Sequence, residues 1–343
     1  VRHAYGTIAK AFEAINKDTD SDSFKITLLD DYTTTDADRD AMGTTVGGSI
    51  QKRTSRPTIV ITGAVNYQKG TSYENWNKLT LNGNVYFSNF DAYITCINIY
   101  GNRKSINGNG NNTSFVNVNV VSTITNINGG GNGVATTENY TLTLDHVTTT
   151  KAAPVKYVYG GSAYVNSGGN ITLQITDSVI YGTVCGTGFC SNGNGNTHTG
   201  NVLMKITNTS VYAYGTPNML NRSTMESAGG AVWGSLDMAV TGNVTINVNG
   251  NYYAQCGTWY TMEGKISGDA SMYFSIKNAS LNNLGSYTDT AVGNNTTAKK
   301  RTISINKTYG AVADKINVTN IFGWNRLELH NCSTSSEQNF GHI

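Results

Sequence analysis

The sequence predicts an all-β fold, a single-domain parallel β-solenoid of roughly 11–12 coils with a short helix at its N-terminal end. Two observations predict it: an unusual composition and one strand pattern that returns along the chain. Among 343 residues there are 43 Asn, 46 Thr and 38 Gly, and only 13% are charged, about half the usual charged fraction. Many short strands joined by tight turns suit this composition better than a helical enzyme or a disordered chain.

The first element that the sequence predicts is an amphipathic capping helix within residues 1–20. Ile8, Phe12 and Ile15 recur at helical spacing and would lie on one face. The remaining residues, 21–343, form the expected solenoid. Because an uncovered solenoid end is an open sheet edge that invites aggregation, a helix packed over the first coil would protect it.

The segment DYTTTDADRD follows the first predicted strand, and we expect a solvated loop there. Its alternating acids Asp36, Asp38 and Asp40 could offer oxygen ligands to Ca²⁺. The segment lacks the glycine and the final glutamate of an EF-hand loop. Calcium is the one cofactor that the sequence suggests, and a loop without metal is the alternative.

The repeated strand is clearest in GNITLQITDSVIYG at 169–182 and GNVLMKITNTSVYA at 200–213. Strict apolar–polar alternation in each copy predicts a strand with one buried face. The shortest spacings between copies are about twenty residues, which favours stacked coils over a sandwich with strands every 8–12 residues.

Longer, loop-bearing coils are expected at about 144–248. The last apolar residues of the copies are Ile61, Leu81, Ile99, Val120, Leu144, Ile175, Ile206, Val248, Ile276, Ile305 and Leu329.

Each strand copy is bracketed by residues that favour turns. Glycines at 169, 200, 242 and 268 mark the turn before the strand. An Asn or Asp follows the strand, where it can adopt a left-handed backbone and bond along the stack. The predicted asparagine ladder consists of Asp177, Asn208, Asn278 and Asn331.

The helix AFEAIN, the strand KITLLDD and the copies GNITLQITDSVIYG and GDASMYFSIKNASL resemble bacterial secreted right-handed parallel β-helix proteins, particularly adhesin-like surface solenoids. The resemblance covers roughly residues 20–340. It lies in the general character of these segments, and no single motif is diagnostic of the family. It implies a right-handed β-helix, three parallel sheets around an apolar core, and an extracellular or cell-surface location.

Catalytic motifs are sparse. The sequence contains no G-x-S-x-G and no P-loop motif. Some β-helix proteins are polysaccharide lyases or glycosidases, but the NTD, GHG and RIK motifs of galacturonase-like families are missing here. An enzyme could still carry its acids in the longer coils, at Asp177, Glu226 and Asp237. Asp145 and His146 are adjacent on a predicted strand, so we expect them to point to opposite faces, with His146 in the ladder position.

Aromatic residues are the remaining candidates for a contact surface. Trp233, Trp259, Tyr260 and Trp324 could form platforms for sugar rings or a protein partner, or they could pack inside wide coils. The best candidates for exposure are Trp233 and Trp259. Cys185 and Cys190 could close a small loop or remain buried thiols.

These observations favour a non-catalytic extracellular or cell-surface structural or adhesive solenoid, such as a fibre subunit or adhesin stalk, over a carbohydrate-active enzyme. The partners expected are glycans or a cell-surface ligand, together with self-association through an uncapped C-terminal coil. The formal net charge of +2 gives no electrostatic case for nucleic acid. No apolar run is long enough to predict a membrane span.

Overall fold

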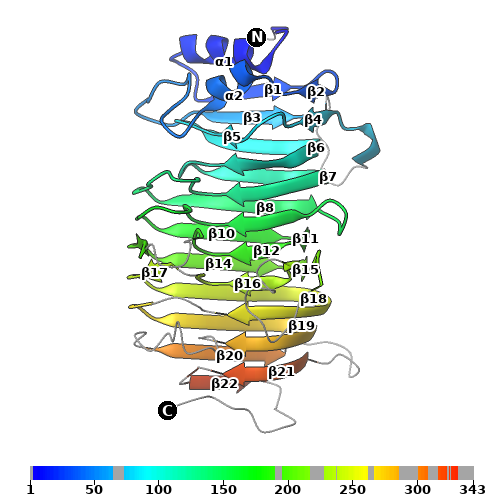
Figure 1. The fold of residues 1–343 in the computed structure, drawn as a ribbon, viewed down its shortest axis with the longest axis vertical. Helices are drawn as coiled ribbons and strands as arrows, with labels where there is room; N and C mark the ends of the chain where they lie inside the picture. The colour runs from blue at the N-terminus through cyan, green and yellow to red at the C-terminus, as the bar shows by residue number, and fades with distance from the viewer. Residues whose placement is uncertain are drawn as a thin grey trace.

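The computed structural model describes residues 3–64, 73–189, 195–216, 228–236, 238–261, 266–285, 300–307, 316–322, 324 and 326–330. Over these residues the chain is a parallel β-solenoid. Its coils stack along the long axis of the molecule, and two helices lie over the N-terminal end (Figure 1). The strands form one 20-stranded sheet and one two-stranded sheet.

Each coil contributes up to three strand segments, and equivalent segments of successive coils pair in parallel to form three columns. The segments arise because the chain bends between them, while the alternation of apolar residues continues. The long strand β6 shows this most clearly, since it pairs in turn with three separate strands of the preceding coil, β3, β4 and β5. The sequence therefore predicted the coil correctly as the unit of the fold.

The first column contains one strand from each of eleven described coils. Its members are β1 (Ser23–Thr27), β3 (Thr58–Thr62), β6 (Asp91–Asn107), β7 (Thr113–Asn128), β8 (Tyr140–Thr148), β10 (Ile171–Thr176), β14 (Val202–Thr207), β18 (Val244–Thr261), β19 (Ala270–Gly285), β20 (Arg301–Lys307) and β22 (Arg326–His330).

The longer strands of the first column extend into the other two, which also contain shorter strands. In the second column these are β2 (Tyr32–Thr33), β4 (Lys78–Thr80), β11 (Val179–Tyr181) and β15 (Ser210–Tyr212). In the third they are β5 (Val85–Tyr86), β9 (Val155–Tyr159), β12 (Thr183–Cys185) and β16 (Ala231–Trp233), while β21 (Ile316–Phe322) spans both columns. The two-stranded sheet pairs β13 (Thr197–His198) with β17 (Ala239–Val240), and η1 (Tyr73–Asn75) is a single 3₁₀ turn.

The pairing corrects part of the predicted repeat. Ile61 and Leu144 do lie in the first column, but Ile99 and Val120 pair with each other in the second, where Leu79 is also a partner of Ile99. Apolar and polar residues alternate in the same way in strands of both columns. This pattern alone therefore cannot show to which column a strand belongs. The paired residues of adjacent coils are separated by 21 residues at Asp91–Asn112 and by 42 at Asn201–Asn243.

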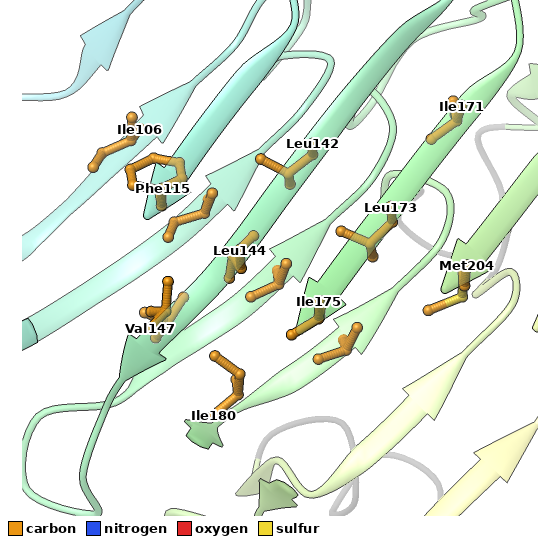
Figure 2. Close-up of a cluster of buried hydrophobic side chains, with 14 of the residues drawn as sticks. Ile106, Phe115, Leu142, Leu144, Val147, Ile171, Leu173, Ile175, Ile180 and Met204 are labelled. Atoms are coloured by element: carbon orange, nitrogen blue, oxygen red, sulfur yellow. The ribbon is translucent and has the colours of Figure 1, made fainter. Parts of the chain in front are cut away.

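The interior of the stack is mostly aliphatic. Leu142 and Leu144 of β8 lie beside Leu173 and Ile175 of β10, and Met204 of β14 continues the row (Figure 2). All five side chains are fully buried. Burial of this continuous apolar column is the main favourable contribution to folding, since each fully buried Leu or Ile contributes about 1.5–3 kcal/mol.

The N-terminal cap consists of α1 (Ile8–Lys17) and α2 (Asp36–Met42). The helix α1 begins after Thr7, whose side chain accepts a hydrogen bond from the Lys10 N–H, and buries Ile8, Ala11, Phe12 and Ile15. The ring of Phe12 packs edge-on against Phe90, with centroids 5.3 Å apart. The helix face predicted from the sequence is therefore confirmed.

Candidate functional site

One corner of the solenoid carries a column of residues with left-handed backbone. Adjacent coils place Cys96, Asn117, His146, Asp177 and Asn208 there, with φ values from 46° to 54°. Gly250 continues the column at φ 97°. A left-handed residue bends the chain sharply and turns it from the first column to the second, even where one strand continues through the bend. Asn, Asp and Gly tolerate this conformation better than other residues.

The predicted asparagine ladder lies at this corner in part. The Asn208 side-chain amide donates to Asp177 Oδ1 at 3.0 Å, which joins two coils. Asn278 differs from the prediction: Ile276 pairs with Gly250 at the corner, and Asn278 pairs with Tyr253 after a register shift. The register shift between Gly250 and Tyr253 displaces Asn278 along the stack. Asn331 lies outside the described residues.

A second ladder, which the sequence analysis missed, precedes the strands of the first column. Asp91, Asn112, Asn170, Asn201 and Asn243 each place Oδ1 against a backbone N–H of the next coil, at 2.9–3.0 Å. Asn139 makes the same contact at 2.7 Å. The recurring pair Gly-Asn before a strand, at 169–170, 200–201 and 242–243, is the sequence signal for this ladder. These side chains satisfy backbone donors between coils.

Three groups with metal-binding atoms meet at the left-handed corner. His146 Nδ1 lies 2.5 Å from Asp145 Oδ1, and His146 Nε2 lies 4.0 Å from Asp177 Oδ2. The expectation that Asp145 and His146 point to opposite faces is wrong. Strand alternation fails at His146 because its φ is 54°, so the imidazole turns back toward the neighbouring carboxylate. His146 nevertheless occupies the turn position that the sequence predicted.

The three acids of the segment DYTTTDADRD do not form a shared cation site. The segment was expected to be a loop but contains the helix α2, whose spacing separates Asp38, which is buried, from the exposed Asp36 and Asp40. Asp38 accepts hydrogen bonds from the Thr35 N–H and hydroxyl, the Ala9 N–H and the Tyr32 hydroxyl. Burial alone would raise the pKa of Asp38, but these hydrogen bonds outweigh it and hold the pKa below its ordinary value. Asp38 thus joins α1 to α2.

Two of the four aromatic candidates are buried. Trp233 points away from the central core, but Tyr159, Cys185 and Leu236 cover it in a separate apolar cluster. Trp324 is also buried, and its indole N–H donates to the Leu284 carbonyl at 2.8 Å. The expected exposure of Trp233 is therefore wrong. Trp259 and Tyr260 pair through their backbones with Ala231 and Val232, while their side chains lie outside the described part of the structure.

Two of the cysteines are buried in the described part of the chain. Cys96 is a free thiol, and burial is the main reason why its pKa is raised. Cys185 is also buried. Cys190 lies outside the described residues, as do Glu226 and Asp237, which the sequence offered as hidden acids.

The outward face of the first column is the broad surface that the described coils share. From β8 to β20 the outward positions carry Thr, Ser, Asn and Gln in register, with Leu203 and Tyr273 among them. Asp145 and Lys205 are the charged residues at these positions. In the middle row, Thr143, Gln174, Lys205, Asn247, Tyr273 and Ser304 follow one another from coil to coil. We call this surface the neutral face.

No helix among the described residues is long and apolar enough to cross a membrane. Comparison of the chain with known protein families, curated proteins and solved structures finds no significant match.

Proposed function

We propose that this chain is a non-catalytic extracellular or cell-surface β-solenoid with a structural or adhesive role. The observation that carries the proposal is the neutral face, which presents mostly hydroxyl and amide side chains in register over successive coils. Such a face matches the hydroxyl groups of a polysaccharide or the polar surface of a protein. Many weak contacts, one set from each coil, would add up to avid binding along the rod.

The location of the protein follows from a different argument. The resemblance to secreted bacterial β-helix proteins, including adhesin-like surface solenoids, supports an extracellular or cell-surface place. In this setting the stacked coils would act as a stalk or as the subunit of a fibre, because the rod gains length by a fixed rise per coil.

The binding test uses purified, tag-free protein mixed with insoluble polysaccharides and with a soluble glycan array. We expect protein to sediment with at least one polymer without shortening it. The variant Thr172→Glu, Gln174→Glu, Thr207→Glu introduces three like charges into the neutral face and should reduce binding at least tenfold. A matched variant that introduces glutamate at the exposed residue Thr19 should bind like the wild type.

Unchanged binding by the triple variant would remove the neutral face from the proposal. Negative-stain microscopy of the same samples checks the fibre role, because end-to-end rods should appear if the chain assembles. Release of new reducing ends or unsaturated sugars from any polymer would overturn the non-catalytic part.

A carbohydrate-active enzyme is the second candidate, and one observation favours it. The carboxylates of Asp145 and Asp177, together with His146, place single atoms within 4.8 Å of one another on adjacent coils. This separation is close to the spacing of about 5–5.5 Å between the two carboxyl groups of a retaining glycosidase. If polymer cleavage is detected, Asp177→Ala should lower the rate by at least a hundredfold, whereas an unchanged rate would exclude this pair of acids.

A further inference from the structure

We propose that Asp145, His146 and Asp177 form a binding site for a divalent transition-metal cation, with Zn²⁺ as the representative ion. This inference does not depend on the proposed function. One ligand atom from each residue lies within 4.8 Å of the other two, and no other such group of three occurs among the described residues. The three residues come from two adjacent coils and share the left-handed corner.

The imidazole is held in an orientation suited to metal binding. With its hydrogen on Nδ1, His146 donates to Asp145 Oδ1 at 2.5 Å and turns the lone pair of Nε2 outward. A carboxylate behind the imidazole is the usual arrangement for a histidine that binds a metal, because it fixes the tautomer and makes Nε2 more basic. Asp145 is therefore a positioning residue, and His146 Nε2 is a ligand.

The second ligand is oriented by the ladder. Asn208 donates its amide to Asp177 Oδ1, which leaves Oδ2 turned toward His146 Nε2 at 4.0 Å. Zinc bonds to nitrogen and to carboxylate oxygen are each about 2.0–2.2 Å long. One ion between Nε2 and Oδ2 would thus bring these atoms slightly closer together, with water at the remaining positions. About two fifths of the Asp177 side chain and a third of that of His146 are exposed, so the site is open to solvent.

The donor set selects the class of ion. Calcium and magnesium take oxygen ligands and prefer several carboxylates or carbonyls, whereas imidazole suits zinc, copper and nickel. One imidazole and one or two carboxylates therefore favour a zinc-like ion over calcium. Two protein ligands on an open corner predict reversible binding rather than a structural ion that the fold requires.

The test is a titration of tag-free protein with ZnCl₂, followed by calorimetry and by NMR of the histidine rings. We expect saturable binding of one ion and a shift of the His146 resonances. His146→Asn and Asp177→Asn should each abolish this binding, and Asp145→Asn should weaken it about 10–100-fold. Calcium at the same concentration should neither bind nor displace zinc.

The structure supplies matched controls. Asn117 and Asn208 occupy the same corner position as His146 in other coils, so His146→Asn keeps a residue that tolerates the left-handed backbone. Far-ultraviolet circular dichroism should confirm that the variant is folded. His330 Nε2 also lies 4.0 Å from a carboxylate oxygen, that of Glu328, but belongs to no described group of three. His330→Asn should leave zinc binding unchanged.

Three results would overturn the site. These are the absence of saturable zinc binding by the wild type, undiminished binding by folded His146→Asn, or equal losses from His330→Asn and His146→Asn. The last result would indicate scattered surface histidines instead of one built site.

Discussion

At the scale of single residues, backbone conformation decides what can stand at the corner of each coil. The left-handed column admits Asn, Asp and Gly readily, and it places Cys96 and His146 in a conformation that such residues seldom adopt. The corner is thus a point where local geometry, rather than burial, selects the residue. It is also where side chains of adjacent coils come within bonding distance.

The cost of this backbone conformation can be measured at Asn208, whose φ is 48°. We expect Asn208→Ala to lower the free energy of unfolding by about 1–2 kcal/mol relative to Asn208→Gly, because alanine resists the left-handed region and glycine does not. Both substitutions remove the hydrogen bond to Asp177, so the comparison isolates the backbone. Urea denaturation of the two variants measures the difference, and equal stabilities would contradict the argument.

A buried histidine predicts how stability responds to acid. His198 is fully buried, with Nδ1 3.0 Å from the Ser167 hydroxyl. Burial lowers the pKa of His198 from 6.5 to about 4. Between these values the unfolded chain binds a proton that the folded chain does not. Stability should therefore fall as the pH drops from 6.5 toward 4, by up to about 3 kcal/mol from this group.

The variant His198→Gln should lose this part of the pH dependence, whatever its stability at neutral pH. The exposed His3 offers the control, because His3→Gln should keep the wild-type slope. Thermal unfolding at half-unit steps between pH 4 and pH 7 provides the measurement. An unaltered slope in His198→Gln would assign the acid response to other groups.

At the scale of elements, the strands of the first column depend on close contact between the turns that precede them. A Cβ added at Gly200 would lie 1.8 Å from the Gly169 carbonyl oxygen, and one at Gly242 would lie 2.3 Å from that of Gly200. These are three of the glycines that the sequence placed before its strands. Their role is to let backbone touch backbone as the coils stack.

We expect Gly242→Ala to lower the free energy of unfolding by about 1–3 kcal/mol, because the added methyl group forces adjacent coils apart. Gly6→Ala is the control, since nothing lies within 4 Å of a Cβ at that position. Guanidinium denaturation of both variants tests the difference. A neutral effect of Gly242→Ala would show that the turn adjusts without cost.

The strands and the cap helix were predictable because each has a strong local pattern. The alternation of Ile171, Leu173 and Ile175 and the helical spacing of Ile8 and Phe12 are visible without tertiary information. The site was less predictable. The meeting of His146 with Asp145 requires a left-handed residue within β8, and that of His146 with Asp177 requires the pairing of β8 with β10, whose paired residues are 31 apart. Trp233 is buried because another segment covers it, and the spacing of the strand repeats does not reveal that segment.

At the scale of the whole molecule, hydrogen bonds and apolar burial outweigh charge. Net charge is low, and the described ion pairs, such as Lys78–Asp31, lie at the surface. Exposed pairs of this kind contribute about 0–1 kcal/mol each. The second ladder instead consists mostly of neutral asparagine side chains bonded to backbone donors, with Asp91 as its one acid, and salt does not screen bonds between neutral groups appreciably.

We therefore expect the free energy of unfolding to change by less than about 1 kcal/mol when NaCl is raised from low to physiological concentration, a range over which surface ion pairs are screened. Urea denaturation at the two salt concentrations measures this, with pH held at neutrality. A larger decrease on adding salt would mean that ion pairs outside the described residues contribute substantially to stability.

In the first column, paired residues of adjacent coils are 21 to 42 residues apart, and yet the register of this column is unbroken. The additional residues of the longer coils do not interrupt the pairing, and the strands keep their separation of about 4.8 Å. The positions of the neutral face are consequently held at fixed distances along the stack. Groups attached at Thr143 and Asn247, three coils apart, would be held about 14 Å from each other, and a peptide grafted into a long coil would be displayed without disturbing that scale.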